Sequence, residues 1–435
     1  MAFAPISQPH LLSGDCHGLR LAKGDVVLPS QGNDKADAID YGQDGCKQQI
    51  TPPLWDANVL YAAFRASQKS APWKPQTHLF EMDFLHQIAL LQKELKTRTY
   101  RTSPKTEFLI RERGKTRLIQ SSRIRDKVVR HAFCDHVLEP ELRKKMVYDN
   151  YASLKDKGVH MCRNRLKVML HRFYRQYGTN DGYILLMDYS GYYDNLQHDK
   201  VLDAVSKVIG DEYAQWLLRL VLDGFKQDVS WLPDEEIKAL DVGRFKALDF
   251  IDIPKRLKTG EKFLRKSLDI GDQCSQILGV YYPTALDQYI KTVRGIKLYA
   301  RYMDDSYVIA KDKQFLIDLL KDVGKITDAM GIILNDRKVR IVKLSQAFRF
   351  LQNSYFLTES GKIVERINPK RITVMRRKLK KLARKMHAGT ANFEDINTMF
   401  RSWKGRHYRI MSRLQRRNMD NLYNSLFKEQ FNEPL

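Results

Sequence analysis

The feature that most constrains this chain is the run YARYMDDSYVI at residues 299–309, where two strand-like segments meet at Asp304 and Asp305. The aromatic and apolar flanks predict a hairpin with two adjacent carboxylates at its tip. Adjacent carboxylates repel and raise each other's pKa unless a cation compensates, and divalent ions do so at phosphoryl-transfer sites. The alternative is a polar turn, although turns made for geometry favour Asn-Gly or Asp-Gly, and Ser306 follows here.

A third carboxylate, Asp188, follows a second strand-like run. Residues 183–187 read YILLM, which predicts a buried strand, and a tight Ser-Gly turn comes after Asp188. If strand and hairpin share one sheet, the three carboxylates meet. Three carboxylates can hold two magnesium ions, which activate a hydroxyl for in-line attack on a triphosphate. The pattern predicts a nucleotidyl-transfer site on Asp188, Asp304 and Asp305.

The net charge indicates a polyanionic partner. The chain carries 75 basic and 51 acidic residues, a formal charge of +24. Residues 366–435 alone hold 18 basic against five acidic residues, interleaved with aromatic ones such as Trp403. A solvated helical face is the alternative for this basic segment, but the imbalance favours contact with a nucleic-acid backbone.

The remaining composition bears on the location of the protein in the cell. The chain lacks an apolar run long enough to span a membrane and a signal-peptide pattern at its start, so we expect no membrane partner and a cytoplasmic location. Its five cysteines never occur as C-x-x-C, which predicts free thiols rather than zinc ligands or disulfides. Residues 1–50 carry six acidic and four basic residues and are expected to form a flexible arm or a small packed extension.

Periodicity places these features on secondary structure. Apolar residues recur with helical spacing between residues 54 and 95, and again over 127–138, 197–225 and 313–330. Runs around 108–110 and 118–119 flank Gly114 and predict a basic hairpin. A strand-rich stretch is expected near 346–357, followed by basic helices.

The motifs then occur in a familiar order. D-Y-S-G-Y-Y-D at 188–194, I-G-D-Q-C-S-Q at 270–276 and Y-M-D-D at 302–305 resemble the motifs of reverse transcriptases. G-K-T-R-L-I resembles the basic fingers segment of that family, G-I-I-L-N-D-R-K the motif after the catalytic hairpin, and F-R-F-L-Q the primer grip. The resemblance runs from about residue 55 to the C-terminus.

The resemblance implies an α+β right-hand polymerase with fingers, an antiparallel palm sheet and a helical thumb. It divides the chain into an N-terminal arm (1–50), fingers with early palm elements (51–180), a palm with the catalytic motifs (181–360) and a basic helical thumb (361–435). The implied cofactor is a pair of Mg²⁺ ions, with Mn²⁺ as a substitute.

The resemblance also assigns residues. The metal ligands are Asp188, Asp304, Asp305 and the backbone carbonyl of Tyr189. Tyr193 matches the steric gate that selects deoxynucleotides, and Lys338 a lysine able to protonate leaving pyrophosphate. The other implied nucleotide contacts are Lys115, Arg117, Arg111, Ile270, Gly271, Ser275 and Gln276. The implied primer and template contacts are Tyr302, Met303, Phe350, Leu351, Arg376, Arg377, Lys380 and Trp403.

One motif departs from the common pattern. Many reverse transcriptases have Q-G-x-x-x-S-P where this chain has Ile270, Gly271, Ser275 and Gln276. The I-G-x-x-x-S-Q form resembles bacterial enzymes of diversity-generating retroelements and of anti-phage defence, and replacement of a polar glutamine by isoleucine suggests relaxed fidelity. The two biological roles stay open.

Three functional hypotheses remain on the sequence alone. The first is an RNA-directed DNA polymerase that makes cDNA from deoxynucleotides on a cognate non-coding RNA. The others are template-independent DNA synthesis by the same site, and an RNA-binding protein without catalysis. An accessory protein or a homo-oligomer is a further partner hypothesis.

Overall fold

The computed structural model describes residues 53–427 except 70, 71 and 113, and for Glu112 and Lys115 it describes the backbone alone. The predicted N-terminal arm, residues 1–50, lies outside the described residues. The described residues belong to one compact unit, so the boundaries at 180 and 360 stay predictions. The mixed α and β class is confirmed. Every helix in the described part of the chain is too short or too polar to span a membrane.

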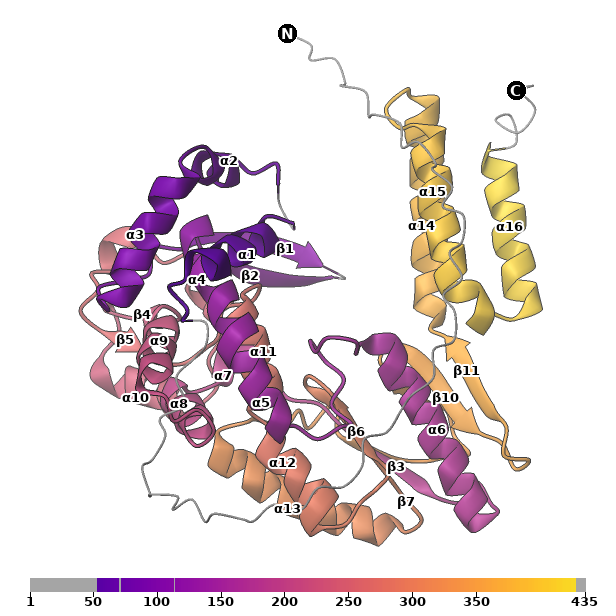
Figure 1. The fold of residues 1–435 in the computed structure, drawn as a ribbon. Coiled ribbons are helices and arrows are strands. Elements are labelled where there is room, and N and C mark those ends of the chain that lie inside the picture. The colour runs from indigo at the N-terminus through magenta and orange to yellow at the C-terminus, as the bar shows by residue number, and fades with distance from the viewer. Residues whose placement is uncertain (1–52, 70–71, 113, 428–435) are drawn as a thin grey trace, which may run out of the picture. The chain divides into compact units, whose positions relative to one another are not determined.

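A four-stranded antiparallel sheet holds the strand before Asp188 and the hairpin around Asp304 and Asp305, and Figure 1 labels its strands β3, β6 and β7. Its strands lie in the order β6-β7-β3-β8, so the strand before Asp188 lies beside the hairpin that bears Asp304 and Asp305. Their bounds are β3 (Tyr183–Met187), β6 (Tyr299–Tyr302), β7 (Asp305–Ala310) and β8 (Arg340–Lys343). The predicted strand and hairpin are confirmed.

The two faces of this sheet pack into different cores. Because side chains alternate along a strand, Ile184 and Leu186 enter one apolar cluster and Leu185 and Met187 the other. Helix α6 (Val159–Tyr177) covers the first face, and α13 (Lys313–Met330) contributes to the second cluster. Burial on both sides explains why β3 is apolar throughout rather than alternating.

The N-terminal part is helical apart from one hairpin. Antiparallel strands β1 (Thr106–Glu112) and β2 (Lys115–Ser121) turn at Gly114, as the sequence predicts. The helices are α1 (Ala57–Gln68), α2 (Pro75–Met82), α3 (Phe84–Lys96), α4 (Ile124–Phe133), the π-helical turn η1 (Cys134–Leu138) and α5 (Glu139–Lys145).

Short elements fill the chain between β3 and β6. They are α7 (Tyr192–Asn195), α8 (His198–Ser206), α9 (Glu212–Asp223), β4 (Gln227–Asp228), α10 (Asp234–Val242), η2 (Ala247–Phe250), η3 (Lys255–Leu257), β5 (Phe263–Leu264), α11 (Gln273–Tyr281), α12 (Thr284–Gln288) and η4 (Tyr289–Val293). The segment from β4 to β5 has its own apolar cluster, in which Val229 and Phe245 meet Leu118 of β2.

The C-terminal part combines a small sheet with three long helices. The antiparallel strands are β9 (Phe348–Phe350), β10 (Asn353–Leu357) and β11 (Ile363–Ile367). The helices are α14 (Pro369–His387), α15 (Phe393–His407), the short η5 (Tyr408–Ile410) and α16 (Arg413–Phe427). These helices pack around their own core, which includes Leu379, Phe400 and Tyr423.

Candidate active site

Strand register brings the three carboxylates to one edge of the sheet. Met187 of β3 pairs with Ser306 of β7, so Asp188 emerges opposite Asp305. Tyr302 and Asp305 close the hairpin, which leaves Met303 and Asp304 as a two-residue turn. Asp188 is buried, and Asp304 and Asp305 are half-buried.

The turn at the hairpin tip is strained. Met303 has φ 59°, a left-handed conformation that favours glycine and that costs a non-glycine residue about 1–3 kcal/mol. Such a turn persists where its surroundings hold it. Here the guanidinium Nη1 of Arg301 donates to the carbonyl of Met303 at 3.0 Å.

Arg301 is itself fixed by a buried ion pair that sequence reasoning did not single out. Its side chain and that of Asp287 are fully buried, with Nη2 to Oδ2 at 2.6 Å and Nε to Oδ1 at 2.8 Å. Tyr299 donates a further hydrogen bond to Asp287 at 2.5 Å, and Arg301 donates to the Val280 carbonyl at 2.8 Å. This network of hydrogen bonds holds β6 and the Met303–Asp304 turn in place.

The segment after α13 supplies one cation, Lys338, and amide donors to Asp188. Lys338 Nζ donates to one carboxylate oxygen of Asp188 at 2.6 Å, and Asn335 Nδ2 to the other at 2.8 Å. The backbone N–H of Asn335 also donates to the Asp188 carbonyl at 2.9 Å. Lys338 was a predicted site residue. Asn335 was not, although it lies in the same G-I-I-L-N-D-R-K motif and its amide was the available signal.

Burial and mutual repulsion perturb the carboxylates of the hairpin. Loss of solvation, followed by the negative charge of Asp188, raises the pKa of Asp304. Loss of solvation together with the charges of Asp304 and Asp188 raises the pKa of Asp305 to about 7. For Lys338, burial opposes the charged ammonium, but the hydrogen bond and charge of Asp188 outweigh it and raise the pKa. The cluster is therefore a site that favours added positive charge.

The β1–β2 hairpin contributes one cation to this edge. Arg117 is exposed on β2, and its charge lowers the pKa of Asp304 against the stronger effect of burial. Arg111 is exposed on β1, opposite Thr116. Lys115 begins β2, and its side chain is outside the described part of the structure.

The loop before α11 is held against the same hairpin. Gly271 has φ 103°, which favours glycine, and a Cβ there would lie 3.8 Å from Ile119 of β2. Asp272 caps α11 and accepts from Arg130 at 2.6 Å in a buried ion pair, a contact that spacing in the sequence does not reveal. Ile270 is half-buried and Gln276 exposed. Ser275 is buried, and its hydroxyl has no partner among the described residues.

Three predicted tyrosines lie close to the carboxylate cluster in the sequence or the structure. Tyr193 places its hydroxyl 3.4 Å from the sulfur of Met303, and Gly279 leaves room for its ring, since a Cβ there would lie 3.1 Å from that hydroxyl. Tyr189 is buried and pairs with Leu334 in an isolated β-bridge. Tyr302 ends β6, half-buried.

The remaining predicted contacts lie on other elements. Phe350 is buried against Tyr307, with ring centroids 4.9 Å apart, and Leu351 is also buried. Trp403 stacks on Phe400 and His407 inside the C-terminal helical core. The structure leaves three of the predicted contacts exposed on α14: Arg376, Arg377 and Lys380. Roles of all these residues in nucleic-acid binding stay predictions.

The donor chemistry of the cluster fits divalent cations. Within the described residues, no three His, Cys, Asp or Glu side chains are already arranged to hold a metal ion. At Asp188 both carboxylate oxygens bond Lys338 and Asn335 instead. Three carboxylates at one edge, two of them with raised pKa, nevertheless form the hard oxygen donor set that Mg²⁺ prefers.

Comparison with known proteins gives only distant likeness. No family model and no curated protein matches the chain. Apo telomerase from Candida tropicalis is similar over 60% of this chain and 48% of that structure, with 14% identity and a TM-score of 0.40. Telomerase from Candida albicans with a fragment of telomeric RNA is similar over 63% and 46%, with 13% identity and a TM-score of 0.41. The chain spans about half the length of these structures, and likeness at this level identifies neither a family nor an activity.

Proposed function

We propose that this protein is an RNA-directed DNA polymerase, a nucleotidyltransferase that copies a dedicated RNA into DNA. The observation that carries the proposal is the convergence of Asp188, Asp304 and Asp305, which the register of β3 and β7 brings to one edge of a sheet. The cluster brings together three partly or fully buried carboxylates of the same charge, which a turn with a purely structural role does not need. The order of motifs around it supports a polymerase over other nucleotidyltransferases.

The residues around the cluster have separable roles in this proposal. Two Mg²⁺ ions held by the three carboxylates would activate the primer hydroxyl and stabilise the charge of the triphosphate. Arg117 neutralises the incoming triphosphate, to which its forked guanidinium is suited. Tyr193 at the hairpin tip excludes a ribose 2′-hydroxyl. Lys338, which is paired with Asp188, would be available to protonate pyrophosphate if a metal ion at Asp188 displaced it.

The finer assignment rests on the loop at residues 270–276. Its I-G-x-x-x-S-Q form favours the bacterial enzymes of diversity-generating retroelements and anti-phage defence. The RNA template is then a cognate non-coding RNA. The gene neighbourhood separates the two roles, because a variable repeat indicates diversification and a structured RNA in a defence cluster indicates immunity.

A templated synthesis assay tests the activity. Purified protein is given deoxynucleotides and Mg²⁺, with and without the RNA encoded beside its gene, and any DNA product is sequenced. We expect a product complementary to that RNA. A homopolymer or random product would instead favour template-independent synthesis, and absence of DNA under all conditions would favour an RNA-binding protein.

Matched variants identify the site responsible. Asp304→Asn and Asp305→Asn keep the size of the side chain and remove its charge, and each is expected to lower synthesis at least 1,000-fold, of the order seen when essential catalytic groups are removed. Asp318→Asn, on the surface of α13, is the control and should retain full activity. Equal activity of all three variants would contradict the assignment.

A further inference from the structure

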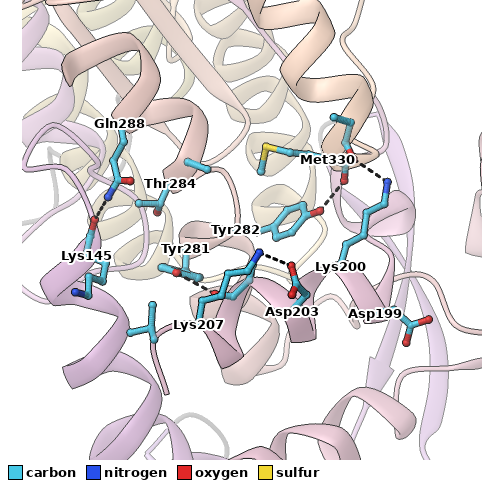
Figure 2. A pocket seen from close by; sticks show the side chains of 14 residues that line it. Lys145, Asp199, Lys200, Asp203, Lys207, Tyr281, Tyr282, Thr284, Gln288 and Met330 are labelled. Atoms are coloured by element: carbon cyan, nitrogen blue, oxygen red, sulfur yellow. Dashed lines mark hydrogen bonds and ion pairs between the residues drawn. The ribbon is translucent and has the colours of Figure 1, made fainter. Parts of the chain in front are cut away.

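A cavity lies apart from the carboxylate cluster. It has a volume of about 640 Å³ and is formed by α8, α12, the C-terminal ends of α11 and α13, and Lys145 at the end of α5 (Figure 2). None of the predicted catalytic or nucleotide-binding residues lines it. Its volume lies within the range of about 300–1,000 Å³ typical of small-molecule sites.

The inner wall of this cavity is apolar. Ala204 of α8 and Val208, which follows that helix, face it together with Met330, Tyr281 and Tyr282. Both tyrosine hydroxyls are already used, since Tyr281 donates to the Ala204 carbonyl at 3.2 Å and Tyr282 to the Met330 carbonyl at 2.6 Å. A ligand therefore meets ring and aliphatic carbon here, which suits a flat apolar body.

The rim of the cavity has an excess of positive charge. Lys207 pairs with Asp203 at 2.7 Å, and Lys200 donates to the Ala329 carbonyl at 2.9 Å (Figure 2). The ammonium of Lys145 has no hydrogen bond or ion pair with any residue that the structure describes. Against these three lysines stand Asp203 and the exposed Asp199. The net positive sign favours an anionic ligand.

Thr284 gives independent evidence for a ligand. Its side chain lines the cavity and is only 4% exposed, and its hydroxyl has no hydrogen-bond partner within the described part of the chain. Buried hydroxyls normally have a partner, and one left without a partner destabilises the fold. An oxygen of a bound molecule would supply the missing hydrogen-bond partner.

We propose that this cavity binds a small organic anion, a molecule with a flat apolar body and one phosphate or carboxylate group. The apolar wall receives the body, Thr284 donates to an oxygen of the ligand, and Lys145 and Lys200 attract its charge. The site is separate from the proposed polymerase site and does not depend on that activity.

Calorimetric titration of the full chain tests the proposal. Two probes separate the sources of the anion: adenosine 5′-monophosphate for phosphates and 2-naphthoate for carboxylates. Adenosine and 2-naphthalenemethanol are their uncharged controls, and inorganic phosphate lacks the apolar body. We expect saturable binding of at least one anionic probe, at least tenfold tighter than its uncharged control.

Variants locate the bound probe. Thr284→Val keeps the shape of the side chain and should weaken binding roughly tenfold, as expected for a lost hydrogen bond to a charged group. Ala285→Trp, at an exposed position of the cavity wall, should block binding without disturbing the core. Lys321→Met, at a surface lysine of α13 that is paired with Asp318 and does not line the cavity, is a control for substitution elsewhere and should bind normally. Melting temperatures check that each variant folds.

Three results would overturn the inference. The first is failure of both anionic probes to bind. The second is equal binding of the charged and uncharged molecules. The third is unchanged affinity in both Thr284→Val and Ala285→Trp, which would place the probe elsewhere, including the nucleotide site.

Discussion

Replacement of Arg301 by methionine should destabilise the protein strongly and loosen the hairpin that carries Asp304 and Asp305. The guanidinium makes a two-point ion pair with the fully buried Asp287 and donates to the carbonyls of Val280 and Met303. Removal of one partner leaves the other charge buried and uncompensated. The expected loss in the free energy of unfolding is about 3–5 kcal/mol, from measured losses of this kind.

A second substitution separates stability from positioning. In Arg301→Met with Asp287→Leu, no charge is left unpaired, so we expect the double variant to recover at least about 2 kcal/mol relative to Arg301→Met alone. The carbonyl of Met303 still lacks its donor, and its left-handed turn loses support. The double variant should therefore be folded but slow in DNA synthesis.

Urea unfolding followed by circular dichroism measures the free energy of unfolding. Primer extension at saturating deoxynucleotide measures the rate of DNA synthesis. Arg111→Met, at an exposed arginine of β1, is the control for loss of an arginine and should leave stability unchanged. A double variant no more stable than the single one would refute the ion-pair argument. A double variant with restored stability and full activity would refute the positioning argument.

Three further predictions concern pH and selectivity. Burial lowers the pKa of His198 to about 4, and its ring nitrogen lies 2.7 Å from the Ser267 carbonyl. As the pH falls, the unfolded chain binds the proton before the folded chain does, so this histidine lowers the free energy of unfolding by about 3 kcal/mol between pH 7 and pH 4. Urea unfolding of His198→Gln should therefore show a smaller loss of stability over this range. Tyr193→Ala should incorporate ribonucleotides more readily in extension assays, and an unchanged preference would exclude the steric gate. Ile270→Gln should lower the misincorporation frequency measured by sequencing, whereas equal error rates would contradict relaxed fidelity.

Local patterns were sufficient for the elements that frame the candidate site. YILLM and the two runs around Y-M-D-D have the β-branched, aromatic and apolar composition of buried strands, and all three strands form as expected. Helix α13 follows from its apolar stripe, and the structure adds an N-cap at Asp312, which accepts from the N–H groups of Gln314 and Phe315. In each case the signal lies within a few residues.

Contacts between distant segments could not be predicted in the same way. Arg130 and Asp272 form a buried ion pair although they are 142 positions apart in the sequence, and no periodicity links them. Asn335 reaches Asp188 only because a β-bridge joins Tyr189 to Leu334. The burial of Phe350 likewise depends on where β9 packs, which the F-R-F-L-Q motif does not encode.

Two effects compensate part of the repulsion among the carboxylates of the candidate site. Asp188 is neutralised by Lys338, whereas burial and repulsion hold the pKa of Asp304 and Asp305 above the ordinary value, so that protonation relieves part of the repulsion. Both compensations are reversible, since Lys338 is half exposed and a proton can leave. The repulsion that remains favours any cation able to replace the ammonium and the proton together. The Arg301–Asp287 ion pair is fully buried, which suits it to keep the hairpin rigid. The Lys338–Asp188 ion pair is half exposed on the lysine side, which suits Asp188 to exchange the ammonium for another cation.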